Sequence, residues 1–208
     1  MVDPDASRPA HGVLWFSGDP EGVAAWLVGG VVSAEVVALD GWTLVRPLEL
    51  PAGLGPYGDA VGLILSRVVP DEHRPVVALT EREGVVVVAA ADQPGDEVHW
   101  VAVQPGVGPR SLGELPTCGP RYMTAAAGVP EQADELAALI ARRRAVGSGA
   151  GELGMRLAMV LGLPEPAVAR RQVEFSHGLV VEPDPREVQR FKQVLSDRLV
   201  ERDEEAGR

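Results

Sequence analysis

Three apolar segments in the middle of the chain, separated by short turns, constrain the fold more than any other feature of the sequence. They cover residues 76–80, 85–91 and 97–103. The first two flank residues 81–84, a Glu-Arg-Glu-Gly sequence that is typical of a hairpin loop. The second segment shows no alternation of apolar and polar residues, which suits a strand covered on both faces. We therefore predict an antiparallel meander over residues 75–104.

Local signals predict a second hairpin and a helix before this meander. Asp40 and Gly41 separate the apolar segments 31–39 and 42–45, and an Asp-Gly pair favours two-residue turns with positive φ. Residues 19–21, an Asp-Pro-Glu sequence, supply an N-cap, a proline at the first helical position and an acid in the first turn. They predict the start of a helix that ends at two glycines. Shorter apolar segments predict a strand at 13–16 and a helix at 59–67.

The chain changes character after residue 104. Residues 105–130 are rich in glycine and proline, and we interpret them as an irregular connection. Beyond them, apolar residues at helical spacing predict helices over 131–145, 151–161 and 185–200. A small hairpin is predicted from 172–175 and 179–182.

These elements predict an α+β fold, with a largely antiparallel sheet in the N-terminal half and a helical C-terminal half that covers or follows it. The chain divides into five parts. They are a flexible N-terminal tail (1–12), an α/β sheet domain (13–104), the Pro/Gly-rich connection (105–130), a mainly helical region with the small hairpin (131–200) and a charged tail (201–208).

Composition narrows the class of protein. The net charge is −11, which opposes binding to nucleic acid or to anionic lipid. The N-terminus lacks the pattern of a signal peptide, and no apolar segment is long enough to span a membrane. One cysteine suits a reducing compartment, so we expect a cytoplasmic protein. Arginine replaces lysine everywhere except at Lys192, which we interpret as the coding bias of a GC-rich, actinobacterial genome.

A glycine-rich segment carries two cofactor hypotheses. Gly149, Gly151 and Gly154 have the G-x-G-x-x-G spacing of a dinucleotide site, but that fingerprint must follow a strand and a helix is predicted before it. Arg144, Gly147 and Gly149 form an Arg-x-x-Gly-x-Gly pattern that resembles the pyrophosphate loop of acyl-CoA N-acetyltransferases. The resemblance implies that these three residues and Gly151 hold acetyl-CoA phosphates. In that family the loop directly follows a strand, whereas roughly 40 residues separate it here from the meander.

A linker interpretation explains the same residues and is the one we favour. Acids at the start of the helix 131–145 and Arg142–Arg144 at its end complement the helix dipole. Gly147 is then a C-terminal cap, and residues 149–151 form the hinge to the next helix.

Other candidate sites are sparse. Cys118 could be a reactive thiol if a neighbouring cation such as Arg121 lowered its pKa, but no signature of a known cysteine enzyme surrounds it, and we favour a passive, partly buried cysteine. The four histidines have no metal-binding spacing, so we predict no metal site. We identify no catalytic residues.

The sequence therefore predicts a non-catalytic intracellular protein that binds a protein partner or a small ligand. The helix 185–200, with apolar residues on one side, packs on its own core or serves as the partner-binding or self-association face. The alternatives are an acyl-CoA-dependent N-acetyltransferase-like enzyme and a thiol-dependent enzyme that uses Cys118.

Overall fold

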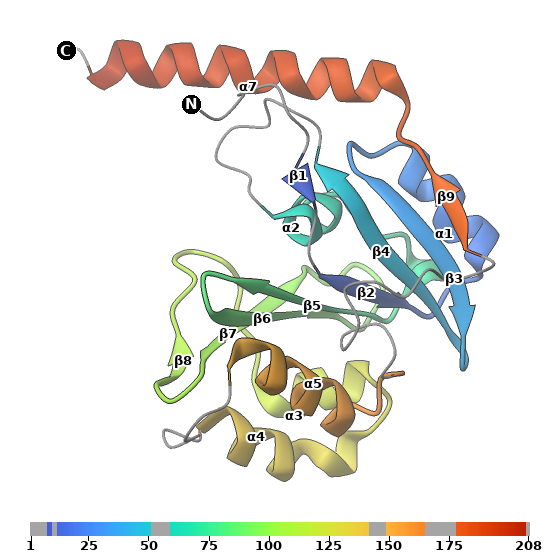
Figure 1. Cartoon of the computed structure of the whole chain (residues 1–208), viewed down its shortest axis with the longest axis vertical. Helices are drawn as coiled ribbons and strands as arrows, with labels where there is room; N and C mark the ends of the chain where they lie inside the picture. The colour runs from blue at the N-terminus through green and yellow to red at the C-terminus, as the bar shows by residue number, and fades with distance from the viewer. Residues whose placement is uncertain (1–7, 10–11, 51–58, 142–148, 165–177, 207–208) are drawn as a thin grey trace.

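One nine-stranded sheet runs through the protein (Figure 1). The computed structural model describes residues 8–9, 12–50, 59–141, 149–164 and 178–206. The strands are β1 (Arg8–Pro9), β2 (Val13–Phe16), β3 (Ser33–Leu39), β4 (Trp42–Leu50), β5 (Val76–Arg82), β6 (Val85–Ala91), β7 (His99–Gln104), β8 (Gly108–Arg110) and β9 (Leu179–Val181).

The strand ladders are antiparallel, and eight strands follow the order β8-β7-β6-β5-β2-β4-β3-β9, with β1 paired to β4. Strands come mainly from the first two thirds of the chain and helices from the rest, which confirms the predicted α+β class. The predicted meander is confirmed as β5, β6 and β7. Asp40 and Gly41 have φ values of 48° and 83°, and they form the predicted turn between β3 and β4.

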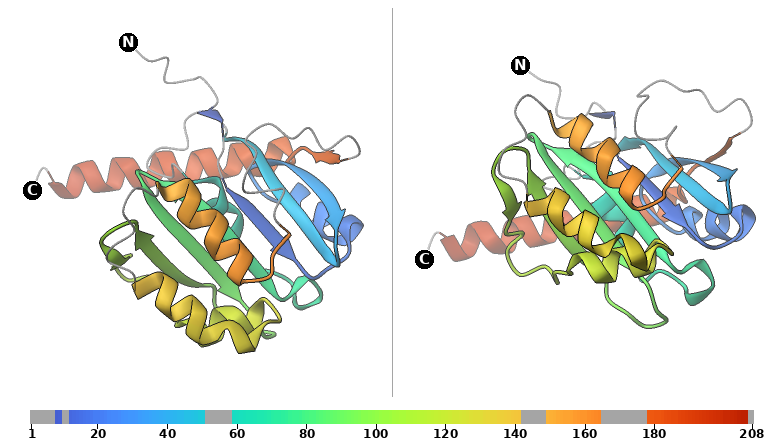
Figure 2. Two further views of the ribbon diagram at one scale, coloured as in Figure 1. Left: turned by 60° about the horizontal axis from the view of Figure 1, so that its bottom comes forward. Right: turned by 90° about the horizontal axis from the view of Figure 1, so that it is seen from below.

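Helices cover both faces of the sheet (Figure 2). On one face lie α1 (Pro20–Val28), α2 (Ala60–Leu65) and the C-terminal helix α7 (Pro185–Ala206), and on the other lie α3 (Pro120–Ala126), α4 (Ala133–Ala141) and α5 (Ala150–Val160). Single-turn 3₁₀ helices, η1 (Asp71–His73) and η2 (Pro130–Gln132), join neighbouring elements.

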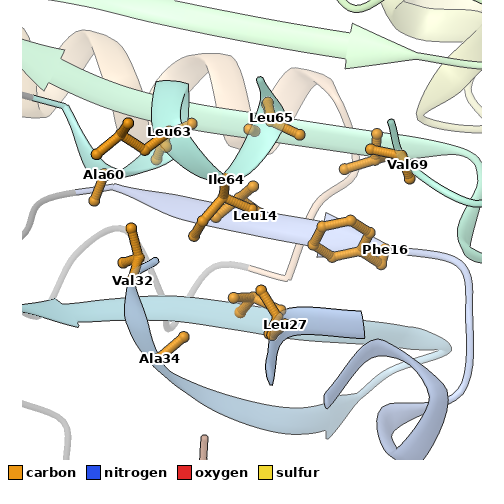
Figure 3. Packing of buried hydrophobic residues seen from close by; sticks show 14 of the residues in the cluster. Leu14, Phe16, Leu27, Val32, Ala34, Ala60, Leu63, Ile64, Leu65 and Val69 are labelled. Carbon is orange, nitrogen blue, oxygen red and sulfur yellow. The ribbon is translucent and has the colours of Figure 1, made fainter. Parts of the chain in front are cut away.

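Buried side chains form two cores: the first lies between the sheet and α1, α2 and α7, and the second lies between the sheet and α3, α4 and α5. The central strand β2 contributes to both cores because its four residues are all buried. Leu14 and Phe16 lie in the first core, with residues of α1 and α2 around them (Figure 3). Val13 and Trp15 point to the second core, under the other helices. This alternation follows from the twofold periodicity of strand side chains, and it fixes the register of the sheet on both sides.

The predicted N-terminal cap at Asp19 forms, and a second side-chain cap forms at Asp184. The backbone N–H of Gly22 donates to the Asp19 side chain at 2.8 Å at the start of α1. The N–H of Arg186 donates to the Asp184 side chain, also at 2.8 Å, at the start of α7. Each bond satisfies one of the backbone N–H groups that a first helical turn leaves without a partner.

The structure corrects two predictions of local structure and leaves a third, the small hairpin, untested. Residues 105–130 are not wholly irregular, because they include β8 and α3. Strand β4 continues to Leu50, past the predicted end at residue 45, because it gains partners in both β3 and β1. Residues 179–181 form a strand as predicted, but they pair with β3 in the main sheet. The other half of the predicted hairpin, 172–175, lies outside the described residues.

Helix α7 starts beside β9 and runs across one end of the molecule (Figure 1). Leu195 is buried in the first core and Phe191 packs against that core. These two residues of the predicted apolar stripe therefore pack on the chain's own core. Within the described part of the chain, no helix is both long enough and apolar enough to cross a membrane.

Candidate functional site

The glycine-rich segment lies between two helices. Arg144 and Gly147 are outside the described residues, and the last element before them is the helix α4. Gly149 is the N-cap residue of α5, without a side-chain capping bond, and Gly151 lies exposed in its first turn. A helix in that place is what the linker interpretation requires and what the dinucleotide fingerprint does not allow. The acetyl-CoA hypothesis stays a prediction.

Cys118 is a partly buried residue that precedes the N-cap of α3 and packs against the second core. Burial raises the pKa of its thiol to about 11, because desolvation disfavours the charged thiolate. Reactive cysteines have the opposite shift, produced by nearby cations or helix N-termini. The surroundings of Cys118 therefore favour the thiol form at neutral pH.

We expect Cys118 to react slowly with thiol reagents in the folded protein. A pKa raised from 9.0 to about 11 lowers the thiolate fraction at neutral pH about 100-fold. The rate of labelling by a disulfide reagent, measured from pH 7 to pH 10, should rise about tenfold per pH unit throughout. The urea-unfolded chain is the control, and its labelling should level off at lower pH. Fast labelling of the folded protein at pH 7 would instead support a thiol-dependent enzyme.

A tyrosine-centred network joins α3 to the loop between β6 and β7. The hydroxyl of Tyr122 accepts a hydrogen bond from the Asp92 backbone N–H and donates one to the Asp96 carboxylate, both at 3.0 Å. The ring of His99 lies 4.8 Å from the Tyr122 ring. Burial, followed by the neighbouring carboxylates, raises the pKa of Tyr122. These contacts hold the loop against α3, so the network has a structural role that sequence reasoning missed.

Two histidines are placed by the structure and neither lies in a metal-binding cluster. His73 is 4% exposed and packs against the backbone of Gly18 and Gly22, whose missing side chains make room for the ring. His99 is a partly buried strand residue, as predicted. Over the described ranges, no group of three or more His, Cys, Asp or Glu residues is arranged to hold a metal ion. His11 and His177 lie outside those ranges.

A groove of about 370 Å³ lies on the outer surface of α4 and α5. The two helices present it because each buries one side in the second core: Leu136 and Ile140 of α4, and Leu153 and Leu157 of α5. These pairs have the i, i+4 spacing of a helix face. The residues that line the groove are Gln132, Glu135, Ala138, Leu139, Arg156, Met159 and Val160.

Methionine and charged groups give the groove its chemical character. Met159 is 62% exposed, which is unusual for a large apolar side chain. Acidic side chains gather at the start of α4, where Glu131, Asp134 and Glu135 follow one another closely. Arg156 lies 3.9 Å from Glu152 and both are about half exposed, so this ion pair is weak. Among the described residues, apolar and polar side chains therefore line the groove together, with one acid, Glu135, and one arginine, Arg156. Further acids lie beside it at the start of α4.

Sequence reasoning treated the residues of this groove as ordinary helix surface. Glu135 and Met159 are 24 positions apart, and only the packing of α4 beside α5 brings their helices together. The one signal in the sequence was that Met159, an apolar residue, falls on the side of its helix opposite the apolar stripe. Comparison of the chain with protein-family models, with curated proteins and with solved structures finds no match.

Proposed function

We propose that this chain is a non-catalytic, cytoplasmic binding protein that takes a segment of a protein partner in the groove between α4 and α5. The observation that carries the proposal is the exposed Met159 in a groove of about 370 Å³, beside Leu139 and Val160. That volume is at the lower end of the range of about 300–1,000 Å³ for ligand sites, so it suits two or three apolar side chains. Methionine adapts its shape easily and is common on surfaces that bind amphipathic segments.

Charge favours one class of partner, a basic amphipathic helix. Asp134 and Glu135 lie on α4 and Glu152 on α5, against one described arginine of these two helices, Arg156. The whole chain carries a net charge of −11, so its long-range field attracts basic segments and repels acidic ones. A helix with apolar residues on one side and lysine or arginine on its flanks suits both the exposed Met159 and the acids beside the groove.

This proposal places the partner in the groove, whereas the sequence analysis placed it on the helix 185–200. Leu195 of α7 is buried and Phe191 packs on the core, so less apolar surface is left for a partner than the isolated helix would offer. Val194 remains 45% exposed on α7, and a partner role of this helix stays a prediction.

A peptide titration tests the proposal. We expect a fluorescent amphipathic helix of leucine and lysine to bind the full chain, with binding that weakens as salt increases. Met159→Asp should weaken it at least tenfold, because it replaces the exposed apolar side chain of the groove by a charge of the same sign as its acids. Val68→Asp, a matched change at an exposed valine between α2 and η1, should leave affinity within twofold.

Two control peptides define the outcomes of this titration. A scrambled peptide of the same composition measures attraction by charge alone and should bind much more weakly. A leucine and glutamate helix should not bind. Equal binding of the helical and scrambled peptides, or no effect of Met159→Asp, would show that the groove is not a binding site.

A further inference from the structure

The two outer strands of the sheet differ in how well they are protected against pairing with another chain. An outer strand exposes a row of unpaired backbone N–H and C=O groups, and proteins commonly block such edges with proline or charge. Strand β8 has both, since Pro109 and Arg110 are two of its three residues. Strand β9 is Leu-Val-Val and contains neither. No strand among the described residues pairs with its outer side.

The exposed side chains of β9 are apolar. Leu179 is 54% exposed and Val180 is 56% exposed. Val28, at the end of the neighbouring α1, is 44% exposed and its carbonyl accepts a hydrogen bond from the Asp184 N–H just beyond β9. An apolar rim therefore borders the open side of the sheet, where pairing with another strand would remove it from water.

Strand β9 packs closely on its neighbour at its start and is anchored at its end. Gly178, just before β9, lies so close to the Glu35 side chain that a Cβ at this position would require that side chain to shift. Glu35 is itself fixed by an ion pair with Arg46 of β4. At its end, the Asp184 N–H bonds to Val28 at 2.8 Å. A rigid edge lowers the entropy cost of adding a strand.

We propose that β9 pairs with β9 of a second copy of this chain, which joins two sheets through a twofold axis at Val180. The strand is complementary to itself in this register. Val180 lies opposite Val180 of the partner subunit, Leu179 opposite the partner's Val181, and Gly178 opposite the partner's Glu182. No like charges meet, and the apolar cross-strand pairs stabilise the contact. Helix α7 starts beside this edge and runs away from it (Figure 1), so α7 itself does not cover it.

The net charge of −11 on each copy opposes association, so pairing should strengthen as salt screens the repulsion. This salt dependence is opposite to that expected for a basic peptide in the groove between α4 and α5. The two interactions are therefore separable, and Met159→Asp should leave self-association unchanged.

Sedimentation velocity of the full chain from micromolar to millimolar concentration tests the proposal. We expect a monomer–dimer equilibrium that Val180→Lys weakens at least tenfold, since it sets two lysines opposite each other. Val68→Lys, the same change at an exposed valine between α2 and η1, is the control and should leave the equilibrium unchanged. A mass that remains monomeric at millimolar concentration, or an equal effect of the two variants, would overturn the proposal.

Hydrogen exchange in the unmodified chain gives an independent readout. The outward amides of residues 179–181 should become protected as protein concentration rises. Protection that is the same at all concentrations would show that the chain's own residues cover this edge, and it would also overturn the proposal.

Discussion

Replacing Phe16 by alanine is expected to lower the free energy of unfolding by about 3–5 kcal/mol. Phe16 is fully buried at the end of the central strand β2, and its ring meets Trp26 of α1 edge-on at 5.6 Å between ring centroids. Figure 3 shows it among apolar residues of the first core, where a cavity cannot be filled by solvent. The loss adds the removed aromatic contact to the cost of the cavity.

Urea unfolding followed by circular dichroism measures this loss. Val68→Ala is the control, because Val68 is 84% exposed and its truncation should change the free energy of unfolding by less than about 0.5 kcal/mol. A loss of less than about 1 kcal/mol for Phe16→Ala would mean that the first core is not packed as the structure shows it.

Removing Arg46 while Glu35 remains is expected to cost about 2–4 kcal/mol, near the range measured for broken buried ion pairs. The Glu35 side chain is 8% exposed and that of Arg46 is 23% exposed, and the two pair across neighbouring strands. In Arg46→Met the carboxylate keeps its burial but loses the guanidinium that compensates its charge. Gly178, which directly precedes β9, lies against Glu35, so β9 should become less ordered at the same time.

A double variant separates the ion pair from the packing of its side chains. Glu35→Leu combined with Arg46→Met removes both charges and should unfold within about 1 kcal/mol of the unmodified protein. Urea titrations of the two single variants and the double variant measure the coupling between the residues. If the double variant is as unstable as Arg46→Met alone, the uncompensated charge is not the cause of the loss.

The sequence predicted the parts of the fold that depend on neighbouring residues. The β5–β7 meander and the Asp40-Gly41 turn were predicted because each strand pairs with the next along the chain. The pairing of β9 with β3 could not be predicted, since it joins residues such as Val181 and Ala34 across most of the chain. Helix α3 was missed because its short sequence lies among glycines and prolines that resemble a loop.

The candidate site was less predictable than the fold. The glycine motif can be recognised in the sequence because its residues lie within a few positions of one another. The groove instead combines Glu135 of α4 with Met159 of α5. Short-range patterns identify caps and turns, but a groove depends on how two helices pack on one sheet face. The Glu35–Arg46 pair was missed for the same reason, since the register of β3 and β4 brings the two residues together.

The methyl resonances of the four methionines report most directly on whether a partner segment occupies the α4–α5 groove. Met159 is 62% exposed in the groove, whereas Met123 of α3 is fully buried and serves as an internal control in the same sample. On titration with the leucine and lysine helix, the account predicts a saturable shift of the Met159 methyl signal while the Met123 signal stays in place. Saturable binding without a shift of Met159, or equal shifts of both methionines, would contradict it.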